Sequence, residues 1–254
     1  MNKSERHALI VFCHPEPRSF NGALKDVAVE TLQRQGYRVE VSDLYAEGFD
    51  PLERPSHYVE RAEPETFLPL TEQRHAYEGG FLPADVKREI ERLEHADLVI
   101  LQFPLWWHAQ PAMLKGWFDR VFVYGGLYSG RMRYDRGRFP EKKGMLSVTT
   151  GAPAPTFTRH GRSGHIVALL WPIHYSLYYL GVSVLPPQVT YGVQGGGLSY
   201  QDEAAFRERL EAEKSAWARR LEGLDGEAAI PFAGWDDWDE QGVLKAEHPL
   251  AWQL

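Results

Sequence analysis

Short apolar runs alternate with segments of helical spacing along most of this chain, and that alternation restricts its possible folds. The predicted strands cover residues 7–13, 37–44, 97–103, 143–149 and 182–191, and the second of them alternates between apolar and polar residues. The helical spacing appears between and after them, at residues 20–34, 83–95, 111–123, 164–180 and 201–221. A strand-helix-strand unit of this kind is parallel and right-handed in nearly all proteins. We therefore predict an α/β fold with a doubly wound, five-stranded parallel sheet.

Three stretches fit this scheme less well. Residues 45–80 carry several prolines, many charges and interleaved aromatic rings, and they are too long for an ordinary connection. We expect an ordered excursion that packs on another surface, such as a partner subunit. Pro186 and Pro187 must bend the fifth strand or place its second half at an edge. We assign residues 1–222 to the sheet domain and residues 223–254 to an extension packed on that domain or on a dimer partner.

Composition excludes several classes of protein. The formal net charge of −7 argues against nucleic acid or an anionic membrane as the main partner. Cys13 is the single cysteine, so no internal disulfide and no cysteine-built metal site is expected, and its apolar setting predicts a buried, inert thiol. No apolar run is long enough to cross a membrane. We expect a cytoplasmic protein with no bound metal.

The turn after the first predicted strand lacks the glycines of a nicotinamide-dinucleotide fold or a phosphate-binding loop. It offers instead a set of polar and basic side chains at the start of a helix, namely His14, Arg18, Ser19 and Asn21. Singly these residues could only cap the helix or bind a loop carbonyl. Together, at the end of a central strand, they favour an anion site at a helix N-terminus.

Two further clusters follow the third and fourth predicted strands. The third strand ends in two tryptophans and a histidine between two prolines, within residues 103–111. The fourth ends in small residues with hydroxyls and free backbone N–H groups, within residues 149–152. In an open α/β sheet such strand ends converge on one crevice. An anion site, an aromatic surface and a polar edge are what a flavin nucleotide requires.

At this point the chain resembles the NAD(P)H:quinone oxidoreductases of the DT-diaphorase family, which are flavodoxin-like flavoproteins. The resemblance covers about residues 7–222. In the first half its motifs are Ala8-Leu-Ile-Val, His14, Ser19-Phe-Asn21, Ser42-Asp-Leu-Tyr45, Ala96-Asp-Leu-Val-Ile and Gln102-Phe-Pro-Leu-x-Trp107. In the second half they are Leu114-Lys-Gly-Trp-Phe-x-Arg-Val-Phe122, Leu146-Ser-x-Thr-Thr-Gly151, Trp171-Pro-Ile173 and Gln188-x-Thr-Tyr191. The resemblance implies strand order 2-1-3-4-5, bound FAD and a homodimer with a site at each subunit interface.

Carried over position by position, the resemblance assigns three groups of flavin contacts. The nucleotide end falls on His14, Phe20 and Asn21, beside Arg18 and Ser19 of the anion site. The surface under the isoalloxazine falls on Pro104, Leu105, Trp106 and Trp107. The ring edge falls on Thr149, Thr150, Gly151 and Ala152. A substrate pocket is implied at His108, at Tyr128 donated by the other subunit, and near His174 and Tyr175.

The chain departs from the family pattern where relatives place a tyrosine and a histidine that relay charge or a proton to the reduced flavin. The matching residues are Phe157 and Ser163, neither of which is an acid near neutral pH. His160 and His165 flank this position and are the candidate catalytic residues; the alternative is a proton from water. A family glutamine that reaches the partner's FAD corresponds to Leu68, which leaves FMN open.

The resemblance predicts FAD-dependent, two-electron reduction of a quinone-like acceptor by NADH or NADPH, in a ping-pong exchange through flavin N5. Alternatives are an azo- or nitro-reductase, or a flavin-bearing regulatory subunit that docks on a partner with little turnover. The physiological acceptor and the choice between NADH and NADPH are open at this stage.

Overall fold

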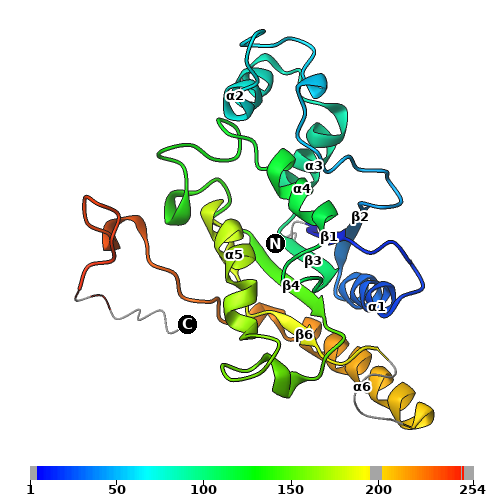
Figure 1. Ribbon diagram of the computed structural model, residues 1–254. Helices are drawn as coiled ribbons and strands as arrows, with labels where there is room; N and C mark the ends of the chain where they lie inside the picture. The colour runs from blue at the N-terminus through cyan, green and yellow to red at the C-terminus, as the bar shows by residue number, and fades with distance from the viewer. Residues whose placement is uncertain (1–4, 195–201, 247, 249–254) are drawn as a thin grey trace.

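A computed structural model describes residues 5–194, 202–246 and 248 of the chain. The strands are β1 (Arg6–Phe12), β2 (Tyr37–Asp43), β3 (Leu98–Pro104), β4 (Lys143–Thr149), β5 (Ser183–Val184) and β6 (Gln188–Thr190). All pairings are parallel, in the order β2-β1-β3-β4-β5, with β6 also beside β4 (Figure 1). The predicted doubly wound sheet and its 2-1-3-4-5 order are confirmed.

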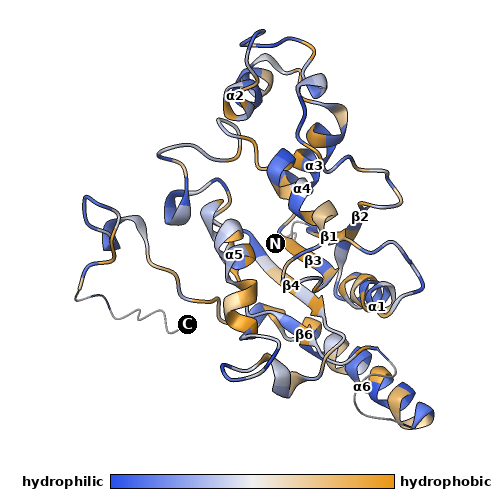
Figure 2. Ribbon diagram, in the orientation of Figure 1, coloured by the Kyte–Doolittle hydropathy of each residue, from blue (hydrophilic) through white to orange (hydrophobic). Residues whose placement is uncertain are grey.

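Helices cover both faces of this sheet. They are α1 (Phe20–Arg34), α2 (Pro69–Gly79), α3 (Ala84–His95), α4 (Ala112–Val121), α5 (Ile166–Tyr179) and α6 (Glu203–Glu222). On one face, Leu24 of α1 and Trp217 of α6 pack against Ile10 and Ile100. On the other face, residues of α3, α4 and α5 form a larger core with the alternate strand residues. Figure 2 shows the resulting pattern, with apolar strands at the centre and polar loops outside.

The turn between β1 and α1 is held in one conformation by local contacts. Ser19 caps α1, as predicted, because its Oγ accepts a hydrogen bond from the N–H of Gly22 at 3.2 Å. A Cβ on Gly22 would lie 1.9 Å from the carbonyl oxygen of Pro17, so only glycine allows this close approach. Gly36 ends the helix with a φ of +83°, the conformation expected at this position. The start of α1 is therefore fixed against the end of β1.

The fifth predicted strand is split into two pieces. Pro186 and Pro187 separate β5 from β6, and both pieces pair with β4 rather than forming one bent strand. Proline has no N–H to donate to a neighbouring strand, which explains the break. The split places Thr190 beside Thr149 and carries the chain to the carboxyl end of the sheet.

Residues 45–80 contain a helix that the sequence pattern did not reveal. α2 begins at Pro69 and ends before Gly80, and its Glu72 is fully buried. That carboxylate accepts hydrogen bonds from Arg61 Nε at 2.9 Å and from the N–H groups of Ala62 and Glu63 at 2.8 and 3.2 Å. Burial alone would raise the pKa of Glu72, but Arg61 and the two N–H groups outweigh it and lower the pKa. An ordered excursion was predicted, and one buried carboxylate organises it.

The chain after Gly223 runs along α5. The ring of Phe232 stacks on Tyr178 with centroids 4.3 Å apart, and Tyr178 donates its hydroxyl hydrogen to Ala233 O at 2.6 Å. The glycines of residues 194–198 predict a flexible turn, of which the structure describes only Gln194, and Trp252 lies outside the described residues. Within the described part of the chain, no helix is long and apolar enough to span a bilayer.

We predict that Glu72→Gln lowers the free energy of unfolding by about 1–3 kcal/mol at pH 7, because it leaves Arg61 and the loop N–H groups poorly paired. A carboxylate whose folded pKa is lowered stabilises the protein above its unfolded pKa, and this contribution is lost as the pH falls through the folded value. The difference from wild type therefore shrinks in acid. Urea unfolding from pH 7 to pH 3 measures it.

The exposed Glu65→Gln, on the same segment, is the matched control and is expected to leave stability unchanged. Equal stability of the Glu72→Gln variant and wild type at pH 7, or a difference that grows in acid, would contradict this account of residues 45–80.

Candidate functional site

The carboxyl ends of β1, β3, β4 and β6 meet at an open cleft of about 640 Å³. Its lining residues come from four separate chain segments: His14, Ser19, Phe20, Asn21, Pro104, Leu105, Trp106, Trp107, Thr149, Gly151, Val193 and Gln194. Ten of these are residues that the sequence assigned to cofactor binding. Parallel strands bring their ends to one edge, so residues as far apart in the sequence as His14 and Gln194 line the same cleft.

A buried hydrogen-bond chain fixes the floor of the cleft. Gln102 Nε2 donates to Asn21 Oδ1 at 2.8 Å, and Asn21 Nδ2 donates to Thr149 Oγ1 at 2.7 Å. All three side chains are at most 3% exposed. In low-dielectric surroundings such paired groups are held firmly, because breaking one bond leaves a buried polar atom unsatisfied. These two hydrogen bonds thereby link α1, β3 and β4 to one another.

The first end of the cleft is suited to an anion. His14 Nδ1 lies 3.0 Å from both the N–H and the carbonyl oxygen of Glu16, and these contacts hold the imidazole ring at the cleft. The first N–H groups of α1 lie at the same end of the cleft, and a helix N-terminus favours negative charge. Arg18 does not join this group: it lies outside the lining and pairs with Glu16, whose pKa it lowers to about 2.

The aromatic part of the cleft is a tight two-residue turn after β3. Trp106 and Ala109 exchange backbone hydrogen bonds at 3.1 Å, while Trp107 and His108 adopt positive φ values of 50° and 64°. Holding two bulky residues in this conformation costs about 1–3 kcal/mol each. The turn places the Trp106 ring 5.9 Å from that of His14 and leaves the Trp107 side chain 95% exposed. His108 is exposed and is not part of the lining.

The opposite edge of the cleft follows β4. Thr149 and Gly151 line it, whereas Thr150 turns inward and donates its hydroxyl hydrogen to Ala152 O at 2.8 Å. Hydrogen bonds from Val193 N–H to Thr150 O and from Gly192 N–H to Ala152 O hold the segment after β6 alongside. Sequence reasoning missed Val193 and Gln194. Their position just after a strand that neighbours β4 was the available clue.

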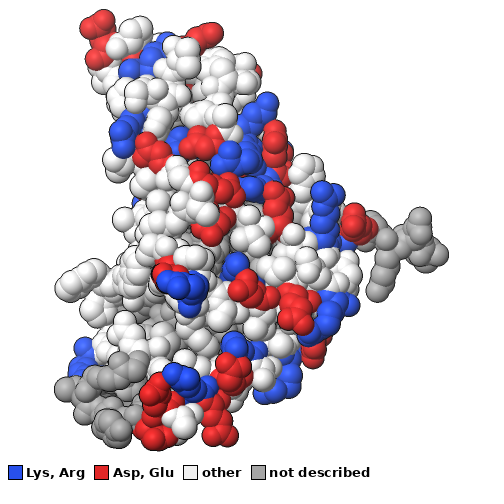
Figure 3. All heavy atoms as spheres, turned by 90° about the vertical axis from the view of Figure 1, so that its right-hand side faces the viewer, with Lys and Arg blue, Asp and Glu red and all other residues white. Residues whose placement is uncertain are grey.

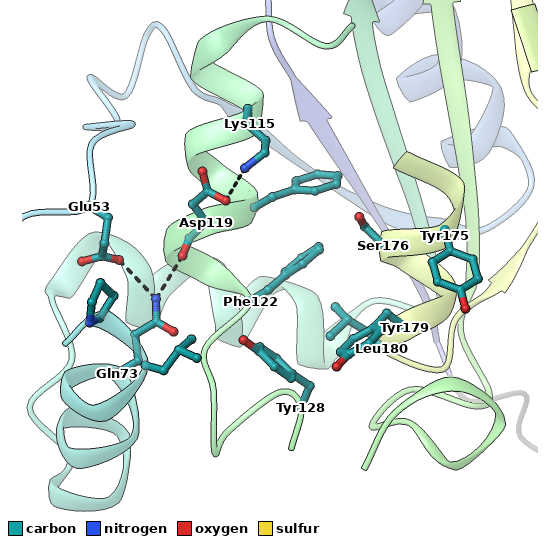
Figure 4. A pocket seen from close by; sticks show the side chains of 13 residues that line it. Glu53, Gln73, Lys115, Asp119, Phe122, Tyr128, Tyr175, Ser176, Tyr179 and Leu180 are labelled. Atoms are coloured by element: carbon teal, nitrogen blue, oxygen red, sulfur yellow. Dashed lines mark hydrogen bonds and ion pairs between the residues drawn. The ribbon is translucent and has the colours of Figure 1, made fainter. Parts of the chain in front are cut away.

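A second cavity of about 530 Å³ lies between α2, α4 and α5 and shares no lining residue with the cleft. Figure 4 shows Tyr128 and Tyr179 on one side of it and Glu53 and Gln73 on the other. Gln73 Nε2 bridges Glu53 Oε2 and Asp119 O at 3.2 and 3.0 Å. Burial raises the pKa of Tyr128. The remaining lining residues are Pro69, Leu70, Lys115, Phe118, Asp119, Phe122, Tyr175, Ser176 and Leu180.

The predicted substrate-pocket residues are thus distributed over separate places. Tyr128 and Tyr175 line the second cavity. His174 lies inside the protein, only 3% exposed, and burial lowers its pKa to about 4, so it is neutral at pH 7. None of these residues, nor His108, lines the cleft of the same subunit.

The two candidate catalytic histidines belong to the loop between β4 and α5. His160 is exposed at the tip of this loop, and His165 is the residue before the first turn of α5. Phe157 is buried with its ring 5.6 Å from that of Tyr191, and Ser163 Oγ donates to Thr156 Oγ1 at 2.9 Å. None of the four lines the cleft, and no cluster able to hold a metal ion is found among the described residues.

The cleft residues fit a flavin nucleotide. The N–H groups of Phe20 and Asn21 at the helix start, and those of Gly151 and Ala152 after β4, have no partner among the described residues. They are available to a phosphate and to the polar edge of a heterocycle, respectively. Trp106 offers apolar surface between these two ends. This donor set therefore matches the anionic, planar and polar parts of the group.

Comparisons with known proteins agree with the geometry. A family model described as the flavodoxin-like fold matches residues 6–215. NAD(P)H dehydrogenase [quinone] 1 of Cavia porcellus is 41% identical over 230 residues, or 90% of this chain and 80% of that protein. Ribosyldihydronicotinamide dehydrogenase [quinone] of Homo sapiens is 40% identical over 228 residues, which cover 89% of this chain and 95% of that protein. A solved Klebsiella pneumoniae structure, named as a candidate quinone reductase, has a TM-score of 0.83 at 36% identity, covering 94% of each chain.

We predict that His174 makes stability fall between pH 6.5 and pH 4. The unfolded chain protonates this residue near its ordinary pKa of 6.5, while burial keeps the folded pKa near 4. Protons therefore favour the unfolded chain across this window. Urea unfolding at pH 7.5 and pH 5 is expected to show a smaller loss for His174→Gln than for wild type. The exposed His160→Gln is the control, and equal losses in wild type and His174→Gln would overturn the assignment.

Proposed function

The chain belongs to the flavodoxin-like family of NAD(P)H quinone oxidoreductases, and from that membership we propose that it reduces a quinone with NAD(P)H through a bound flavin. The observation that carries the proposal is the cleft itself. Helix N–H groups with His14, the Trp106 surface and the free N–H groups after β4 line one opening at the strand ends.

The protein residues bind and orient in this reaction. A bound flavin supplies the group that takes a hydride from NAD(P)H and returns it to the acceptor. Overall, NAD(P)H, a proton and a quinone give NAD(P)⁺ and a hydroquinone. The N–H groups of Gly151 and Ala152 stabilise negative charge at the ring edge, because they are fixed before the reaction begins. Trp106 and Leu105 exclude water from one side of the ring.

Water delivers the proton in this proposal. The residues at the family's relay positions are Phe157, which has no acidic hydrogen, and Ser163, whose hydroxyl is bound to Thr156. His160 and His165 lie outside the lining, and we assign them no proton transfer in this step.

We further propose that the active unit is a homodimer, in which each cleft lies against the second cavity of the partner. Tyr128 and Tyr175 line a cavity remote from the cleft lining of their own subunit. Trp107 beside the cleft is 95% exposed, and Leu52 and Leu70 near the second cavity are 55% and 52% exposed. Large apolar side chains exposed in this way favour association. The pairing would bury all three and enclose the ring.

FAD is the flavin we propose. The family resemblance implies it, and the apolar Leu52 and Leu70 of the partner subunit offer contact surface for an adenine ring. Leu68 occupies the position of a family glutamine and is itself 45% exposed on this segment. Heat release of the flavin followed by chromatography identifies it directly: FAD supports the proposal, and FMN contradicts it.

The proposed function predicts two spectral changes. Anaerobic NADH or NADPH is expected to bleach the flavin absorbance of the purified protein, and a simple quinone to restore it with one quinone consumed per flavin. A flavin that neither donor bleaches would contradict the reaction. A protein that retains no flavin and gains none on reconstitution would contradict the site.

We predict that Asn21→Leu weakens flavin binding by roughly tenfold to hundredfold, because it leaves Gln102 Nε2 and Thr149 Oγ1 without their partner under the cleft. Quenching of flavin fluorescence measures the Kd. The control is Gln33→Leu, at an exposed position of the same helix, with wild-type affinity expected. Circular dichroism of the flavin-free proteins separates loss of binding from loss of folding; a folded Asn21→Leu variant with wild-type affinity would contradict the role of this chain.

A further inference from the structure

A long stretch of this acidic protein has no carboxylate at all. The chain carries 35 aspartate and glutamate residues, yet none lies between Glu141 and Asp202. This stretch includes β4, the loop after it, α5, β5 and β6, and it supplies Thr149, Gly151, Val193 and Gln194 to the cleft lining. Its four cations are Lys142, Lys143, Arg159 and Arg162. Because the stretch has no carboxylate of its own, the contacts of these four side chains with the rest of the protein decide which of them remain unpaired.

The two lysines form hydrogen bonds with backbone carbonyl oxygens and so stabilise the fold. Lys142 donates to the carbonyl oxygens of Glu94 and Ala96, and Lys143 donates to Leu224 O at 3.1 Å, at the amino end of the sheet. Arg159 and Arg162 are exposed, and neither has an ion pair or side-chain hydrogen bond with any described residue. Elsewhere the charges are mixed: Figure 3 shows acidic and basic side chains interspersed on the face that it presents.

The loop that carries these arginines has a defined conformation. The N–H of Gly161 donates to Thr158 O at 3.0 Å, and that of Gly164 donates to Gly161 O at 3.2 Å. Two successive β-turns result, with Arg159 and His160 at the centre of the first and Arg162 at the centre of the second. Ser163 is joined to Thr156 through its N–H and its hydroxyl, both at 2.9 Å. Both guanidinium groups are thereby presented from one compact loop.

The loop stands on the rim of the cleft. It follows Gly151, which lines the cleft, and Phe157 at its base packs on the ring of Tyr191 at 5.6 Å. Tyr191 leads directly into Val193 and Gln194, which also belong to the lining. Figure 1 shows the loop between β4 and α5 passing below β6, at the carboxyl end of the sheet. A ligand that extends out of the cleft over Gly151 therefore meets this loop.

We propose that Arg159 and Arg162 bind the 2′-phosphate of NADPH, and that the protein consequently prefers NADPH to NADH. The inference rests on the proposed function, because it assumes that a dinucleotide hydride donor enters the cleft. A phosphate monoester carries nearly two negative charges and three strong acceptor oxygens, which two guanidinium groups can bind together. NADH has only a hydroxyl at that place. The pyrophosphate, common to both donors, lies nearer the nicotinamide and provides no discrimination.

A binding experiment tests this inference without any catalytic turnover. Titration calorimetry compares adenosine 2′,5′-bisphosphate with adenosine 5′-monophosphate, on the flavin-loaded protein. Wild type is expected to bind the bisphosphate more tightly, and the double variant Arg159→Gln, Arg162→Gln to lose roughly tenfold to hundredfold in affinity for it. The monophosphate affinity is expected to stay unchanged. The matched control is Arg38→Gln, Arg219→Gln, which removes two exposed cations outside the loop.

Kinetics of the two half-reactions separate this inference from its rivals. In the double variant, kcat/KM for NADPH is expected to fall at least tenfold while that for NADH and the rate of reoxidation by quinone stay within about twofold. Equal losses with both donors, no loss, or a loss confined to an anionic acceptor would overturn the inference. If neither donor bleaches the flavin, the proposed function fails, while the bisphosphate titration still decides whether these arginines bind a 2′-phosphate.

Discussion

The hydrogen-bond chain from Gln102 through Asn21 to Thr149 is the interaction on which the rest of the site depends. It joins the first turn of α1 to the ends of β3 and β4, all in the protein interior. Without it, the helix N–H groups and the ring-edge N–H groups would have no fixed separation. The cleft is open to solvent on one side, so its geometry has to be maintained from below.

The same constraint explains why a strained turn is tolerated above it. Trp107 and His108 hold positive φ values because β3 ends at Pro104 and α4 begins at Ala112, with both ends fixed by packing. The turn places both tryptophans at the cleft and leaves Trp107 almost fully exposed. In the homodimer that we propose, the cleft with its exposed indole lies against the tyrosine-lined cavity of a second copy of the chain.

Much of this was predictable from the sequence, for a specific reason. Most residues of β1 and β3 are apolar, those of β2 alternate between apolar and polar, and Ser19 and Gly36 mark the limits of α1. Because parallel strands share a carboxyl edge, residues after the first, third and fourth strands could be placed in one site. The lining residues His14, Trp106 and Thr149 follow from that rule alone.

Other features depend on contacts between distant parts of the chain. The order in residues 45–80 depends on Glu72, whose burial the sequence does not reveal. Arg18 was assigned to the anion site, yet its side chain pairs with Glu16. A carboxylate two residues away competes with a bound anion for the guanidinium group, and the position of Arg18 at a strand end does not reveal this competition. Tyr128 was expected to reach the substrate pocket from the other subunit, and within one chain it lines the second cavity instead.

The central claim is that one working site combines the cleft of one subunit with the second cavity of its partner. Mixed dimers test it most directly. One subunit carries Asn21→Leu in the cleft, the other carries Tyr128→Ala in the cavity, and different affinity tags allow the mixed dimer to be isolated. The account predicts that the mixed dimer regains about half of the wild-type quinone reductase activity, since one of its two sites is intact, while each parent dimer is impaired at both. A mixed dimer no more active than its parents would contradict the claim.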